Sequence, residues 1–126
     1  MRPVIGGEWS TVEDVFAAFS TARYNNPRPL ERYEADAEIL FAWNHSHGYE
    51  EQAIVLWRSR ENGTLHMIEA SHCSCYGYEG QWGDSPIDIP AIKLMWEKPY
   101  QGSDAEAWAP ALMKVVKKIE KSYLKQ

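Results

Sequence analysis

Cysteine and long apolar runs are both scarce in this 126-residue chain. Its two cysteines, Cys73 and Cys75, are separated by one residue, a spacing that does not allow an unstrained disulfide between them. No apolar stretch approaches the roughly 18 residues that cross a membrane, and residues 1–7 lack the apolar core of a signal peptide. We therefore expect a cytoplasmic protein with reduced thiols and no membrane partner.

The sequence also lacks the short motifs of common enzyme classes. It has no Gly-Lys-Ser/Thr phosphate loop, no dinucleotide-binding glycine pattern and no His-Glu-x-x-His. These absences favour a binding protein over an enzyme, although an enzyme of another class stays open.

Charge is unevenly distributed. The net charge of −5 argues against nucleic acid as a partner of the protein as a whole. Residues 114–126, however, carry five lysines against Glu120 alone, a local charge of +4. We interpret these lysines as the solvated face of a helix, with a basic surface for phosphate or an acidic partner as the alternative.

The length predicts a single domain over residues 1–126, large enough to fold without a disulfide or metal. Three apolar segments rich in β-formers predict strands, at residues 38–43, 53–58 and 65–70. Asn62-Gly63 predicts a hairpin between the second and third. The polar residues 45–51 read as a loop, which makes the sheet a three-stranded antiparallel meander. A fourth short strand could join it, although residues 83–86 read as a turn.

Helices are predicted before and after these three strands in the sequence. Apolar residues recur with helical spacing over residues 11–21, after a capping box formed by Ser10 and Glu13. Residues 90–98 fit a helix capped by Asp88 slightly better than a strand. A second capping box at residues 103–106 opens a C-terminal helix, which Pro110 should kink or restart. The fold class is therefore α+β, with an N-terminal and a C-terminal helix packed on the sheet.

The meander makes a further prediction. Its first and third strands run in the same direction, so their ends lie at one end of the sheet, together with the start of the second. Imidazoles, thiols and carboxylates would converge there from three segments: His45, His47, Glu50, Glu51, His72, Cys73 and Cys75.

Two chemistries are open at this sheet end. Two thiolates and two imidazoles form a tetrahedral zinc set, which would use Cys73, Cys75, His45 and His47, although Cys-x-Cys is not the usual knuckle spacing. A thiol activated by His45 or His47 could instead be a nucleophile. The alternative is that the cysteines are small buried residues and the histidines polar loop residues, with no cofactor.

The segment that follows the third strand is rich in aromatic residues and glycine. Tyr76, Tyr78 and Trp82 alternate with Gly77 and Gly80, a composition typical of binding surfaces because large rigid rings gain contact area at little entropic cost. The same rings could instead close the end of the core.

Residues 71–82 carry a resemblance. Their sequence is similar to that of small uncharacterised phage and prophage proteins with a Ser-His-Cys-Ser-Cys-Tyr/Phe-Gly-x-Glu-x-Gln-Trp motif, and the similarity extends over residues 38–82. The His45-x-His47 pair and residues 83–86 depart from that pattern. The family has no settled activity, so the resemblance supplies no catalytic residue.

The resemblance implies a small accessory protein in the cytoplasm of a bacterial host. It would bind a host protein, such as a defence or transcription component that it inhibits, or a small ligand. A homodimer is compatible with this role. The expected binding residues are His72, Tyr76, Tyr78, Glu79, Gln81 and Trp82.

Overall fold

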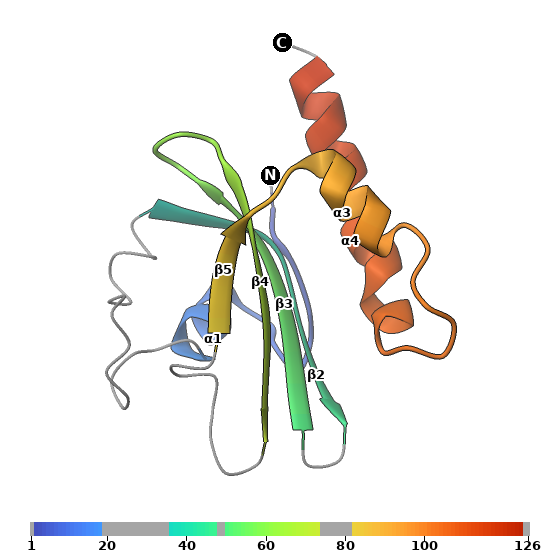
Figure 1. Ribbon diagram of the computed structural model, residues 1–126. Helices are drawn as coiled ribbons and strands as arrows, with labels where there is room; N and C mark the ends of the chain where they lie inside the picture. The colour runs from blue at the N-terminus through green and yellow to red at the C-terminus, as the bar shows by residue number, and fades with distance from the viewer. Residues whose placement is uncertain (1, 19–35, 48–49, 74–81, 125–126) are drawn as a thin grey trace. The chain divides into compact units, whose positions relative to one another are not determined.

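The computed structural model describes residues 2–18, 36–47, 50–73 and 82–124 (Figure 1). The chain divides into two compact units, Met1–Pro86 and Ile87–Gln126, which we call the sheet unit and the helical unit. The single domain expected from the length stays a prediction, as does the packing of the C-terminal helix on the sheet.

The sheet unit contains a five-stranded mixed sheet. Its three central strands are antiparallel, which confirms both the α+β class and the predicted meander, and β1 is parallel to β2. The strands are adjacent in sequence order: β1 (Val4–Gly7), β2 (Ala37–His47), β3 (Glu50–Ser59), β4 (Leu65–Cys73) and β5 (Trp82–Pro86).

The central strands are longer than their apolar segments indicate. Residues 45–51 were expected to form a loop, but β2 continues to His47 and β3 begins at Glu50, with these two residues paired. The loop prediction was wrong for these residues because antiparallel pairing continues through polar residues once the apolar parts have fixed the register. At the other end the Asn62-Gly63 hairpin is confirmed, and Gly63 has a φ of +76°.

The two outer strands were missed or misread. β1 is short and ends in two glycines, so no local pattern indicated a strand there. Residues 83–86 were read as a turn, but they belong to β5, which pairs with β4 from Trp82 opposite Ala70 to Pro86 opposite His66. An edge strand tolerates glycine and proline, because one of its sides needs no ladder hydrogen bonds.

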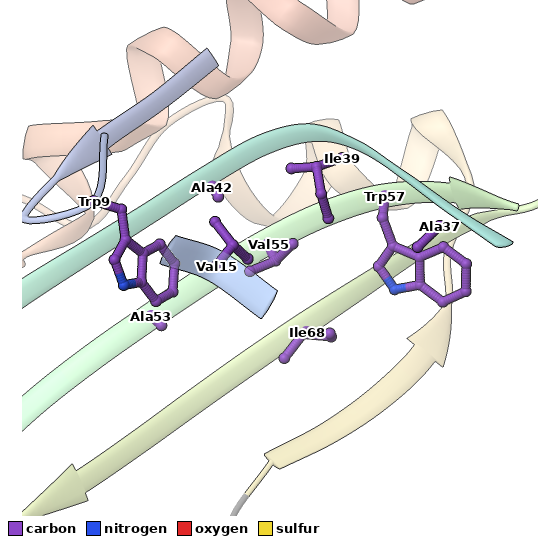
Figure 2. Packing of buried hydrophobic residues seen from close by; sticks show 9 residues of the cluster. All are labelled: Trp9, Val15, Ala37, Ile39, Ala42, Ala53, Val55, Trp57 and Ile68. Atoms are coloured by element: carbon purple, nitrogen blue, oxygen red, sulfur yellow. The ribbon is translucent and has the colours of Figure 1, made fainter. Parts of the chain in front are cut away.

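One face of the sheet packs against helix α1 (Val12–Ala18). The centre of this core is a cross-strand row in which Val55 lies between Ala42 and Ile68. Full burial of a side chain such as Val55 contributes about 1.5–3 kcal/mol. Figure 2 shows the buried cluster drawn from α1, its preceding segment and three strands: Trp9, Val15, Ala37, Ile39, Ala42, Ala53, Val55, Trp57 and Ile68.

Residues of the opposite face of the central strands are also buried. Phe41 pairs with Leu56 and Leu56 with Met67, and all three are at most 5% exposed. The apolar part of β2, from Ile39 to Ala42, is therefore buried on both faces.

The start of α1 differs from the predicted capping box by one residue. The Ser10 and Thr11 N–H groups donate to Asp14 Oδ2 at 2.9 and 3.1 Å, and the Asp14 N–H donates to Thr11 Oγ1 at 3.1 Å. Thr11 and Asp14 therefore form the cap, in place of Ser10 and Glu13. The backbone N–H groups of Ser10 and then Thr11 lower the pKa of Asp14 below its ordinary value. The predicted residues 19–21 of this helix lie outside the described ranges.

The helical unit consists of α3 (Ile89–Trp96) and α4 (Ala105–Leu124). The helix over residues 90–98 is confirmed, together with its cap: the Ala91 N–H donates to Asp88 Oδ1 at 2.9 Å. The rings of Trp96 and Trp108 meet edge to face with their centroids 4.7 Å apart, which joins the two helices.

Two details of α4 differ from expectation. The helix continues through Pro110 as one element, so the expected restart does not occur. At its start, Glu106 Oε1 accepts from the Gly102 N–H at 2.7 Å, while the Ser103 hydroxyl donates to the Tyr100 carbonyl. Only the carboxylate half of the predicted capping box therefore forms, and it acts one residue earlier than expected.

Candidate functional site

The ends of the central strands meet as the meander predicted. His47 pairs with Glu50 and Glu50 with Cys73, while Ser46 pairs with Glu51 and Glu51 with His72. A third row joins His45, Gln52 and Ser71. We call residues 45–47, 50–52 and 71–73 the motif end of the sheet, because the Cys-x-Cys and aromatic segment of residues 71–82 begins there. The backbone thus brings His45, His47, Glu50, Glu51, His72 and Cys73 to one place.

The remaining motif residues connect two neighbouring strands at this end. β4 continues for three residues beyond Ala70, which pairs with Trp82 at the start of β5. β4 therefore ends at Cys73 in the motif end, and β5 begins at Trp82, beside Ala70 (Figure 1). Most of the predicted binding and metal residues in this segment lie outside the described residues: Cys75, Tyr76, Tyr78, Glu79 and Gln81.

Sequence reasoning missed a polar contact at the motif end. The Ser46 hydroxyl lies 2.6 Å from Glu8 Oε1 and 3.3 Å from Glu51 Oε1, so a single hydroxyl proton faces two carboxylates. Glu8 reaches this place because β1 pairs with β2, and its N–H donates to the Asn44 carbonyl at 3.1 Å. No local signal could have revealed this contact, since it joins residues 38 positions apart and depends on the unexpected β1.

The fourth histidine, His66, belongs to the core side of the sheet. It lies opposite Trp57, and the two rings stack with centroids 4.1 Å apart and an interplanar angle of 10°. The register places it away from the motif end, several residues before Ser71 on β4. His66 therefore acts in packing and does not contribute to the motif end.

The structure gives limited information on metal binding. Across the side chains that it describes, no three His, Cys, Asp or Glu residues are grouped as ligands. Of the expected zinc set, His47 and Cys73 are placed by backbone register alone, in one row with Glu50 between them. His45 occupies a neighbouring row, and Cys75 lies outside the described residues. The zinc set stays a prediction.

Comparisons with family models, curated proteins and solved structures returned no match to this chain. No helix within the described residues is long and apolar enough to cross a membrane. The candidate site therefore rests on its own geometry and sequence.

Proposed function

We propose that this protein is a small phage- or prophage-type accessory protein that acts by binding. Its recognition surface is the motif end of the sheet together with the aromatic segment between β4 and β5. Its partner is a host protein in the bacterial cytoplasm, for example a defence or transcription component that it inhibits, or a small ligand.

The observation that carries this proposal is the position of the segment in the fold. It connects the antiparallel neighbours β4 and β5, and the paired ends of β2, β3 and β4 lie beside its points of departure and return. Binding residues are commonly found on loops held by a rigid scaffold. Here the scaffold is a sheet whose central strands have buried residues on both faces.

The composition of the segment supports recognition over catalysis. Tyrosine and tryptophan supply most of the energy in many interfaces, because they bury large rings with few rotatable bonds. The segment contains Tyr76 and Tyr78, and Trp82 begins β5 directly after it. Glycines between these aromatic residues let a partner approach the backbone.

Affinity capture with matched variants tests the proposal. Tagged protein carrying Tyr78→Ala or Trp82→Ala should lose the partner that the unmodified protein retains from host lysate. Tyr100→Ala is the control, because Tyr100 is 86% exposed in the helical unit and loses the same side chain as Tyr78. Thermal unfolding of each variant separates lost binding from lost folding. A partner that is retained by both motif variants would contradict the proposal.

A second candidate function is a metal- or thiol-dependent enzyme. The observation that favours it is the row formed by His47, Glu50 and Cys73, since imidazole, carboxylate and thiolate all ligate zinc and an imidazole can activate a thiol. Substituting Cys73 and Cys75 by serine discriminates the two functions. An enzyme of this kind would lose bound zinc or thiol reactivity, whereas a binding protein would retain its partner.

A further inference from the structure

The last helix carries its lysines on one face. At 3.6 residues per turn, Lys114, Lys117, Lys118 and Lys121 fall within an arc of about 100° around α4, and all four side chains are exposed. We call these four residues the lysine face. The opposite side of the helix is buried through Leu112, Val115, Val116 and Ile119, each at most 1% exposed.

Glu120 is the only acidic residue between Lys114 and Lys121, and it forms an ion pair with a lysine of α3. Glu120 Oε1 lies 2.8 Å from Lys93 Nζ of α3, so its charge is balanced within the helical unit. No described residue forms an ion pair with the four lysines. Lysines three and four positions apart on a helix repel one another, and an external anion would relieve that repulsion.

The two units also differ in charge. Residues 87–126 carry seven lysines against five carboxylates, a net charge of +2. Because the whole chain carries −5, residues 1–86 carry a net charge of −7. The acidic total therefore conceals a basic helical unit, and the argument from net charge against anionic partners does not apply to α4 by itself.

We propose that the lysine face binds the phosphate backbone of nucleic acid without reading its sequence. Lysine is a compact point charge that suits phosphate oxygens, and lysine is depleted in protein–protein interfaces. The face contains no arginine for bidentate contact with bases and no aromatic ring for stacking. This inference goes beyond the proposed function and concerns the other unit of the chain.

Salt dependence of binding to a labelled 20-base-pair duplex, followed by fluorescence anisotropy on the full chain, tests the inference. Four phosphate contacts predict that log K falls against log salt concentration with a slope of about −3.6, a loss of roughly a hundredfold in affinity between 50 and 200 mM salt. Lys118→Gln and Lys121→Gln should each make the slope shallower by about 0.9.

Lys98→Gln is the matched control, because it removes the same charge from an exposed lysine outside α4. It should leave the slope unchanged. Absence of binding at 50 mM salt, or equal effects of Lys98→Gln and Lys118→Gln, would overturn the inference. Poly-glutamate that competes as well as unlabelled duplex would also overturn it, and would indicate an acidic protein as the partner. Tyr78→Ala should not affect the slope, so this test and that of the motif end fail independently.

Discussion

Gly7 determines how the chain leaves β1. Its φ is +71°, a left-handed conformation that residues with a Cβ adopt at a cost. A Cβ built there would lie 1.8 Å from the Asn44 carbonyl oxygen, so the approach of the two strands also requires glycine. The next residue is Glu8, whose contact with Ser46 therefore depends on this glycine.

Gly7→Ala should destabilise the sheet unit by about 3 kcal/mol, because conformational strain and the clash with β2 act together. Gly63→Ala is the control: Gly63 has a similar φ of +76°, but a Cβ built there meets no atom within 4 Å, so the variant should lose only about 1–2 kcal/mol. Urea unfolding of both variants measures the difference. Equal losses would show that the contact with Asn44 is not tight.

Asp14 makes the cap of α1 sensitive to acid. Its pKa is lowered in the folded protein because the carboxylate accepts hydrogen bonds from the Ser10 and Thr11 N–H groups. The stabilisation that it provides is therefore complete above its unfolded pKa of about 3.8 and is lost as the pH falls below that value through the lower folded pKa.

Comparison of the free energies of unfolding of the unmodified protein and Asp14→Ala, from pH 6 to pH 2, tests this account. The difference should be constant at the upper end of the range and should shrink at the lower end. A difference that is unchanged at pH 2 would mean that the charge of Asp14 has no role in the cap.

At the scale of elements, Pro110 is the least favourable residue of α4. It lies in the interior of the helix, where proline lacks the N–H that would donate to Glu106 and costs up to about 3 kcal/mol relative to alanine. Because Pro110 is exposed, Pro110→Ala should raise the thermal midpoint followed by circular dichroism at 222 nm. A lower midpoint would indicate that the proline ring makes packing contacts that outweigh the missing hydrogen bond.

The sequence predicted those elements whose signals are local. β2, β3 and β4 contain apolar segments of β-formers, and Asn62-Gly63 marks the hairpin between the last two. β1 and β5 lack such segments and form because a neighbouring strand offers an unpaired edge. Their pairing is a property of the assembled sheet, and no window of sequence around Gly7 or Gly83 reveals it.

The candidate site shows the same division. The convergence of His47, Glu50 and Cys73 followed from the meander alone, since the direction of each strand determines which ends meet. The contact of Glu8 with Ser46 required the parallel pairing of β1, which joins segments far apart in the chain. The grouping of side chains could be predicted where neighbouring strands follow one another in sequence. It was missed where the paired strands are far apart in the chain.

At the scale of the whole molecule, the two units suggest two separate tasks. The sheet unit is acidic and carries the motif end, while the helical unit is slightly basic and carries the lysine face. The proposed recognition by the motif end and the proposed contact of α4 with phosphate would use different residues and would respond differently to salt. Variants in one unit should therefore leave the other activity intact.

Site-specific photo-crosslinking in bacterial cells tests the central claim most directly. A photoreactive phenylalanine analogue replaces Tyr78 in one sample and Tyr100 in the other, since both positions accept an aromatic ring. Illumination should give a discrete adduct of higher mass from position 78 and none from position 100. An adduct from position 100 alone, or none from either position, would contradict recognition through the segment between β4 and β5.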